Sequence, residues 1–260
     1  MSWWKVLLPV LIGLAVVGWL FWRDARAHDL GDVWREISFT PRVLACVALA
    51  WVFMLGRDFG LSWRFRALTD RALSWKKAIR VNMLCEFTSC ITPSAVGGSS
   101  LGMVFLNREG IELGRATTLM LTTLFLDELF FVVSCPIVVL LTPAGELFTS
   151  GSGAFQTGLQ YTFWTVYALI TAWTALLLCG IIIWPRGIHA LITRLFRLRL
   201  LRRWRHRASE LADNMVSTSA SLRAKPFLFW LETFGGTALS WTSRYLVVNA
   251  LFLAFVPSAI

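Results

Sequence analysis

The chain has 260 residues, of which 57% are hydrophobic and only 15% are charged. A soluble domain is about 45–50% apolar and about 25% charged, so this composition excludes an ordinary water-soluble domain. The formal net charge of +10 is gathered between apolar segments, which is typical of cytoplasmic membrane loops rather than of a nucleic-acid-binding surface. We therefore expect an all-α, polytopic transmembrane helical bundle that forms one domain over residues 1–260.

Apolar stretches of about 20 residues predict the membrane-spanning helices. In chain order, the predicted spans cover residues 3–22, 41–63, 117–141, 161–184 and 226–255. The first is longer than the apolar region of a signal peptide, and no small-residue cleavage site follows it directly. Pro136 is expected to kink the third span.

Two basic blocks between the spans, residues 64–80 and 186–225, predict the orientation. Because cytoplasmic loops are rich in Lys and Arg, both blocks are expected in the cytoplasm of an inner-membrane protein. The N-terminus is then cytoplasmic, and the loops at residues 23–40 and 144–160 lie outside. The second block is expected to form a basic amphipathic segment whose arginines meet anionic headgroups.

Residues 81–107 are predicted to form a re-entrant helical hairpin. They start and end on the cytoplasmic side, yet two full crossings would need about 40 residues. Thr92-Pro93 and Gly97-Gly98 lie at the middle of the stretch, where a chain reversal is expected. The alternative is a tilted helix that ends at Pro93 and is followed by a cytoplasmic loop.

The turn of this hairpin is the predicted binding site for a lipid phosphate. Ser99 and Ser100 are expected to cap the second half-helix, whose N-terminus offers amide donors and the positive end of its dipole to an anion. The predicted lipid- and phosphate-binding residues are Pro93, Gly97, Gly98, Ser99, Ser100, Arg80 and Arg108. A tight turn that uses glycine for close helix packing is the structural alternative.

Charged residues within the membrane segments are a second group of candidates, because each costs about 2.5–3.5 kcal/mol at a helix centre. They are Glu86, Asp127, Glu128, Glu232 and Arg244. Asp127 and Glu128 point about 100° apart on a helix, so they cannot both face one ligand closely. In the functional interpretation Arg244 contacts a lipid phosphate and is balanced by Asp127 or Glu86. In the structural interpretation Asp127 and Arg244 form an ion pair that holds the bundle together.

Several short motifs follow one another between residues 55 and 135. They are Trp63-Arg64-Phe65-Arg66-Ala67-Leu68, the segment 75–80, Thr92-Pro93-Ser94-Ala95-Val96-Gly97-Gly98, Asn107-Arg108-Glu109-Gly110-Ile111 and Gly114-Arg115-Ala116. In this order they resemble the transmembrane domain of the lysylphosphatidylglycerol synthase and flippase-like (UPF0104-type) family. The family has an acidic residue on the next helix, and Asp127 takes that place here. The resemblance implies an inner-membrane protein that moves, or helps to modify, an anionic or isoprenoid-linked lipid.

The chain departs from this family pattern in two ways. No aminoacyl-transferase domain follows the membrane part, so lipid aminoacylation by this chain alone is not expected. The sequence stops at Ile260 within an apolar run, where family members continue into further spans, and we expect a truncated form or a fragment.

These observations favour a lipid translocator over an enzyme, with an anionic, aminoacylated or isoprenoid-linked lipid as its cargo. A membrane-embedded glycosyl- or aminoacyl-transferase that acts on a lipid phosphate through Asp127 and Glu128 is the alternative, and a non-catalytic membrane subunit is a third. The sequence has no metal-ligand spacing and no nucleotide-binding motif, so no metal or cofactor is expected. The expected partners are membrane lipids, with anionic headgroups at the cytoplasmic face, and a second copy or another membrane protein.

Overall fold

The computed structural model describes residues 14–20, 22–23, 40–91, 96–142, 154–184, 187, 190 and 205–255. All regular secondary structure within these ranges is helical, which confirms the predicted all-α class. The elements are α3 (Pro41–Leu68), α4 (Trp75–Ile91), α5 (Val96–Arg108), α6 (Leu113–Leu141), α7 (Ala154–Leu178), the π-helix η1 (Cys179–Ile183), α9 (Arg205–Arg223) and α10 (Phe227–Phe255).

Four helical segments are long and apolar enough to cross a membrane. They are Pro41–Leu68, Leu113–Leu141, Gln156–Ile181 and Phe227–Phe255. They correspond to four of the five predicted spans, so the chain is a multi-pass membrane protein. The other prediction, at residues 3–22, lies largely outside the described residues, of which 14–20 are helical.

Helix α3 is longer than the sequence indicated. The predicted span ended at residue 63, before Arg64, but the helix continues without a break to Leu68. The helix tolerates these charges because they have partners: Arg64 pairs with Asp127 of α6, and the guanidinium of Arg66 lies 4.9 Å from the centroid of the Trp75 ring. Arg64 therefore belongs to the helix and not to the basic loop in which we had placed it.

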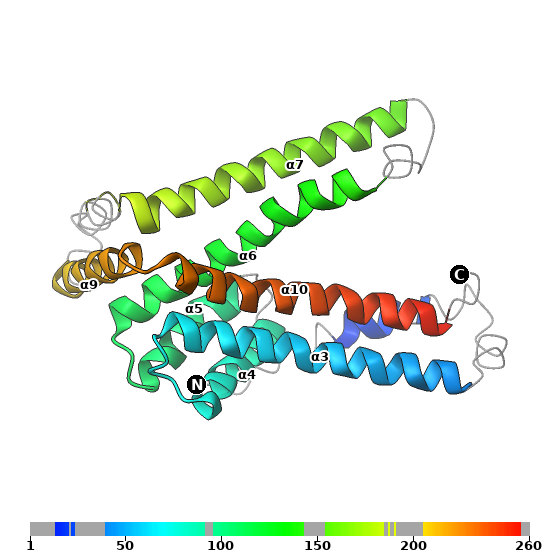
Figure 1. The fold of residues 1–260 in the computed structure, drawn as a ribbon, viewed down its shortest axis with the longest axis horizontal. Helices are drawn as coiled ribbons and strands as arrows, with labels where there is room; N and C mark the ends of the chain where they lie inside the picture. The colour runs from blue at the N-terminus through cyan, green and yellow to red at the C-terminus, as the bar shows by residue number, and fades with distance from the viewer. Residues whose placement is uncertain are drawn as a thin grey trace.

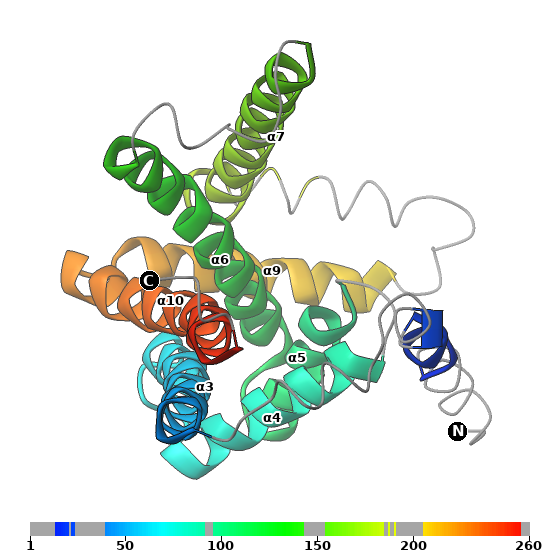
Figure 2. The ribbon, with the colours of Figure 1, turned by 90° about the vertical axis from the view of Figure 1, so that its right-hand side faces the viewer.

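The spanning helices form two antiparallel pairs, α3 with α10 and α6 with α7 (Figure 1). The pairs meet at one end of the molecule, where α4, α5 and α9 pack beside them, and they diverge toward the other end (Figures 1 and 2). We call the two parts the packed end and the splayed end. Among the described residues, the packed end comprises 57–131, 177–184 and 205–244, and the splayed end comprises 41–56, 132–142, 156–176 and 245–255.

Small residues bring α3 and α10 into close contact. A Cβ atom added to Gly60 would lie 2.7 Å from the carbonyl oxygen of Gly236, and one added to Gly236 would lie 2.9 Å from that of Gly60. Four residues before Gly60, a Cβ on Gly56 would lie 3.0 Å from Ser243 Oγ. This Gly-x-x-x-Gly spacing lets two backbones approach each other, as in many membrane helix pairs.

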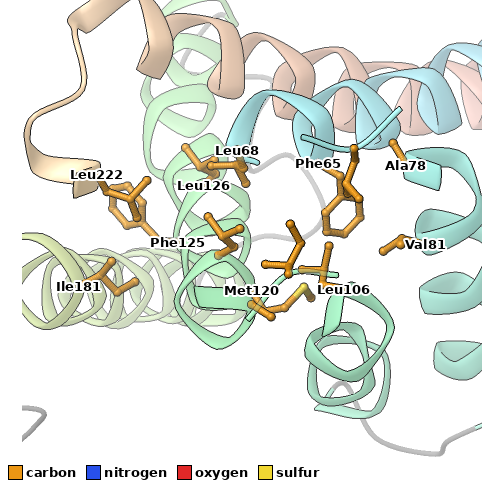
Figure 3. Close-up of a cluster of buried hydrophobic side chains, with 14 of the residues drawn as sticks. Phe65, Leu68, Ala78, Val81, Leu106, Met120, Phe125, Leu126, Ile181 and Leu222 are labelled. Atoms are coloured by element: carbon orange, nitrogen blue, oxygen red, sulfur yellow. The ribbon is translucent and has the colours of Figure 1, made fainter. Parts of the chain in front are cut away.

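The hydrophobic core lies at the packed end (Figure 3). Leu68, Leu106 and Leu119 are fully buried and come from α3, α5 and α6. Ile181 of η1 and Leu222 of α9 extend the cluster on another side of α6. The splayed end instead exposes large apolar side chains: Leu140 is 83% exposed and Trp51 is 68% exposed. Such a surface suits contact with lipid tails.

Helices α4 and α5 are short and run in opposite directions. They have 17 and 13 residues, about 25 and 20 Å at 1.5 Å per residue. Lys77 and Arg80, near the start of α4, contact Glu109, which directly follows α5. A Cβ on Gly102 of α5 would lie 3.2 Å from Cys85 Sγ of α4, so the two helices pack closely. The predicted hairpin at residues 81–107 therefore corresponds to two helices, with its turn at residues 92–95 outside the described residues.

Pro136 lies inside α6, and the helix continues past it to Leu141. A proline has no N–H group, so the carbonyl of Val132, four residues earlier, loses its helical hydrogen bond. The hydroxyl of Tyr167 on α7 donates to that oxygen at 3.1 Å. This contact compensates for the missing bond and joins α6 to α7.

Candidate functional site

Arg64 is a buried cation between three spanning helices. Its residue is 4% exposed, and Nη1 contacts Asp127 Oδ1 of α6 at 2.5 Å and Thr237 Oγ1 of α10 at 3.3 Å. The Nε atom is also buried, yet it has no hydrogen-bond partner among the described residues. A buried guanidinium with an unused donor can accept a further anionic ligand without losing its present one.

The carboxylate of Asp127 accepts a second hydrogen bond. Trp241 Nε1 of α10 donates to Asp127 Oδ1 at 2.9 Å, and the Trp241 ring makes an edge contact with Phe131 at 4.7 Å between centroids. Arg64, Asp127 and Trp241 form what we call the inner triad. The predicted ion pair of Asp127 with Arg244 is wrong. The guanidinium of Arg244 lies 5.1 Å from the centroid of the Trp241 ring on its own helix, whereas the extension of α3 brings Arg64 to Asp127.

A second group of the same composition lies nearer the membrane surface. Trp63 Nε1 donates to Glu232 Oε1 at 3.1 Å, and Arg71 Nη2 lies 3.5 Å from the same oxygen. We call Arg71, Glu232 and Trp63 the outer triad. The side chain of Arg71 is 69% exposed and that of Arg64 only 5%, so the two triads differ in their arginines, whereas Glu232 and Asp127 are both half-buried. In both triads the same carboxylate oxygen accepts a hydrogen bond from an indole N–H and forms an ion pair with a guanidinium.

Arg57 provides a third cation, about two helical turns from Arg64 along α3 toward the splayed end. It forms an ion pair with Glu86 of α4 and lies 3.1 Å from Asp58, its neighbour on α3. The predicted candidate Glu86 therefore faces α3, and its side chain is only partly exposed. Arg57 and Arg64 are seven residues apart on α3, and a seven-residue step returns to nearly the same face of a helix. Arg71 lies beyond the end of α3, in the turn that leads to α4.

The structure leaves the predicted phosphate site at the hairpin turn untested. Pro93 lies outside the described residues, and Gly97, Gly98, Ser99 and Ser100 lie in α5 without described side chains. Since α5 begins at Val96, Ser99 and Ser100 do not precede the helix, so their predicted capping position is wrong. The other two predicted residues lie at the packed end: Arg80 pairs with Glu109, and Arg108 is the last residue of α5.

Glu128 stands apart from the triads. Its side chain is half-buried on α6 next to Asp127, and it forms no ion pair or hydrogen bond with the part of the chain that the structure describes. As predicted from the helical geometry, Asp127 and Glu128 do not share a partner there.

Ion pairs outside the membrane segments tie the packed end together. Asp70 accepts from Arg115 at 3.1 Å and also from Lys225, so it links the α3–α4 connection to the starts of α6 and α10. Glu109 lies 3.2 Å from Lys77 Nζ and 3.1 Å from Arg80 Nη1. Hydrogen bonding to Lys77, with a further contribution from Arg80, holds the pKa of Glu109 below its ordinary value.

Residues 10–260 match the model of the family described as the lysylphosphatidylglycerol synthase TM region. The chain belongs to this family. The match covers nearly the whole chain and confirms the resemblance drawn from the motifs. Both triads lie within the matched residues.

The chain is also similar to a UPF0104 membrane protein of Archaeoglobus fulgidus. The two are 26% identical over 141 residues, which cover 52% of this chain and 40% of the relative. The chain thus spans less than half the length of this curated relative in the match. No solved structure matches the chain.

The sequence did not predict that charged side chains would be bonded by Trp63, Trp241 and Thr237. Tryptophan in a membrane helix is usually apolar surface, and only the tertiary arrangement places an indole N–H against a carboxylate. Two signals were present in the sequence: the seven-residue spacing of Arg57 and Arg64, and the four-residue spacing of the glycines in α3.

Proposed function

We propose that the chain is a lipid translocator that moves an anionic, aminoacylated or isoprenoid-linked lipid. The observation that supports this function best is the inner triad. A charged group in a membrane segment costs about 2.5–3.5 kcal/mol, so buried charges there are retained chiefly where they serve a substrate or hold helices together. Arg64 does hold helices together, but its unused Nε donor is also suited to a phosphate oxygen.

The position of the inner triad agrees with this role. Asp127 on α6 and Trp241 on α10, which bond each other, lie within about one helical turn of residues 132 and 245, where the splayed end begins on these helices. A lipid headgroup held there has polar partners on the packed side, and its tails would meet the exposed apolar side chains of the splayed end on the other.

In this proposal α4 and α5 form a re-entrant hairpin. Both helices are too short for a full crossing of about 30 Å, and the contacts of Glu109 with Lys77 and Arg80 bring their outer ends together. The packed end carries nearly all the basic residues of the described spans and loops, which supports its assignment to the cytoplasm of an inner-membrane protein with a cytoplasmic N-terminus.

Partners follow from the same chemistry. Membrane lipids are the proposed substrate, and anionic headgroups are the proposed contact of the basic face. A second copy of the chain or another membrane protein is the further proposed partner. A membrane-embedded transferase is less well supported, because the carboxylate that it would use as a base, Asp127, already accepts bonds from Arg64 and Trp241.

The test is lipid movement in proteoliposomes that contain the purified chain. We expect intact, labelled phosphatidylglycerol to cross the bilayer and an Arg64→Gln/Asp127→Asn variant to lose this activity. The double change removes both charges together, so no unpaired charge remains to unfold the bundle. Leu140→Ala, at a side chain of the splayed end that is 83% exposed, is the control and should retain activity. If folded wild-type protein moves no more lipid than empty vesicles, the proposed function is wrong.

A further inference from the structure

Three arginines form a series that runs from the turn after α3 back along the helix toward the splayed end. Arg71 follows the end of α3 and is largely exposed, Arg64 is buried, and Arg57 lies further along α3 toward the splayed end. The helical rise places Arg57 and Arg64 about 10 Å apart along the axis. Their carboxylate partners come from three different helices: Glu232 from α10, Asp127 from α6 and Glu86 from α4.

Two of these carboxylates have an indole donor as well. If Arg64 turned toward another anion, Asp127 would still hold the 2.9 Å bond from Trp241 Nε1. If Arg71 turned away, Glu232 would still hold the 3.1 Å bond from Trp63 Nε1. The indole N–H therefore lowers the cost of separating each ion pair, because a buried carboxylate without a donor is strongly destabilising.

We propose that the phosphate group of a lipid passes along Arg71, Arg64 and Arg57 in turn, and that Trp63 and Trp241 hold the carboxylates that it displaces. This inference rests on the proposed function and specifies its route. At each arginine the phosphate replaces a carboxylate, so the guanidinium keeps an anionic partner throughout. The ligand chemistry is a phosphate ester, and Trp63 and Trp241 act as positioning residues that do not touch the substrate.

The geometry of Arg64 explains how the exchange begins. Its bond to Asp127 uses Nη1, while Nε, a separate donor of the planar group, is buried and has no partner among the described residues. A guanidinium can bind two anions at different edges, so a phosphate oxygen binds Nε before Asp127 leaves. Neither a fully exposed arginine nor a fully bonded one offers this sequence of steps.

The experiment measures the movement of labelled phosphatidylglycerol in proteoliposomes for Trp63→Phe and Trp241→Phe. Each change keeps an aromatic ring and removes the N–H donor. We expect each to slow movement about tenfold, since a hydrogen bond to a charged group contributes about 1.5–3 kcal/mol. Trp51→Phe, at an exposed position of the splayed end, should match the wild type. Movement of a labelled glucosylceramide, which has no phosphate, should be unchanged in all three variants.

A second measurement separates this route from the proposed function. Native mass spectrometry of the detergent-solubilised chain records bound phosphatidylglycerol, with inorganic phosphate as a competitor. We expect the wild type to retain the lipid, Trp241→Phe to bind it more weakly and Arg64→Gln/Asp127→Asn to lose it. Displacement of the lipid by inorganic phosphate would assign the site to free phosphate and overturn the lipid route.

The outcomes are distinguishable. If the wild type moves phosphatidylglycerol and both tryptophan variants move it equally fast, the route is wrong and the translocator function stands. If the wild type moves no lipid, but phosphatidylglycerol binding weakens from the wild type to Trp241→Phe and is lost in Arg64→Gln/Asp127→Asn, the arginine series binds a headgroup. The translocator function is then wrong. If binding is the same in the wild type and all variants, the route is overturned whatever the transport result. Equal thermal unfolding temperatures for Trp241→Phe and the wild type exclude loss of fold as the cause.

Discussion

The packed end and the splayed end contain the same kind of helices but differ in what surrounds them. At the packed end, the spans carry arginines and carboxylates that are paired across helices, and the buried core lies among them. In the splayed ranges 41–56, 132–142, 156–176 and 245–255, Arg42 is the one charged residue in the sequence. Its guanidinium bonds the carbonyl oxygen of Leu253.

This difference indicates how the bundle is held together. Lipid tails are as apolar as leucine, so apolar side chains alone give membrane helices little reason to associate. Close backbone contact and polar pairing provide that reason, and both occur where the helices are packed. The comparison can be tested by changing matched residues at the two ends.

The largest loss of stability is expected when the charged pair of the inner triad is broken. Asp127→Leu leaves Arg64 buried without its counter-ion, which should lower the free energy of unfolding by about 3–5 kcal/mol. Arg64→Met/Asp127→Leu should recover most of this loss, because neither charge remains. Unfolding by denaturant in detergent micelles provides the measurement. Leu140→Ala at the splayed end should change stability by less than about 0.5 kcal/mol. A similar loss for Asp127→Leu and Leu140→Ala would refute the comparison.

The next effect concerns the contact between α3 and α10. Gly60→Ala places a methyl group against the backbone of Gly236, so the helices must separate, at a cost of about 1–3 kcal/mol. Gly158→Ala in α7 meets nothing within 4 Å and should be neutral or stabilise by up to about 1 kcal/mol through helix propensity. Thermal unfolding of the two variants in the same detergent gives the comparison. A stable Gly60→Ala protein would mean that the close approach is not required.

A smaller effect is expected within the splayed end. Tyr167→Phe removes the hydroxyl that bonds Val132 O, where Pro136 leaves the carbonyl without its helical partner. The loss should be about 1 kcal/mol. Tyr161→Phe, whose side chain is 73% exposed, is the control and should behave as the wild type. If both variants are equally stable, the α6–α7 pair is held by packing alone.

The smallest effect is a pH dependence at the edge of the packed end. Lys77 and Arg80 lower the pKa of Glu109 in the folded protein, so the ionised carboxylate contributes stability above the pKa of the unfolded chain, about 4.3. The contribution is lost as the pH falls through the lower, folded-state pKa. Glu109→Gln should therefore unfold at a slightly lower temperature than the wild type at pH 7, and the difference should vanish in acid. A difference that is constant with pH would exclude this explanation.

The spans were predictable because length and composition alone decide whether a helix can cross a bilayer. The residues at which the helices begin and end were not predictable, as α3 shows. The sequence indicates that a loop starts at Arg64, because the partner of Arg64 on α6 is not evident from the local sequence. Likewise, the antiparallel helices α4 and α5 were expected from the short interval between two basic ends, yet α4 starts at Trp75 and not near residue 81. Boundaries depend on ion pairs that the local sequence does not contain.

The candidate site was predictable in its carboxylates and not in their partners. Glu86, Asp127 and Glu232 stand out because charge is rare in apolar stretches, and each lies in an ion pair. Arg244 stood out for the same reason, but its neighbour is the Trp241 ring. Which arginine meets which carboxylate depends on helix packing. The paired arginine lies 29 residues from Glu86, 63 residues from Asp127 and 161 residues (232 − 71) from Glu232.

The contact between α3 and α10 also has a consequence for how the chain is made. Arg64 leaves the ribosome 63 residues before Asp127 and 173 residues before Thr237. At about 5–20 residues per second, α3 waits roughly ten to thirty seconds for α10. During that time, the four arginines and the aspartate of α3 oppose its partition into lipid, and of the carboxylate partners on other helices only Glu86 arrives early. We therefore expect α3 to remain beside the insertion machinery until later helices emerge. Biogenesis of this bundle would then depend on how long the insertion machinery holds the incomplete chain.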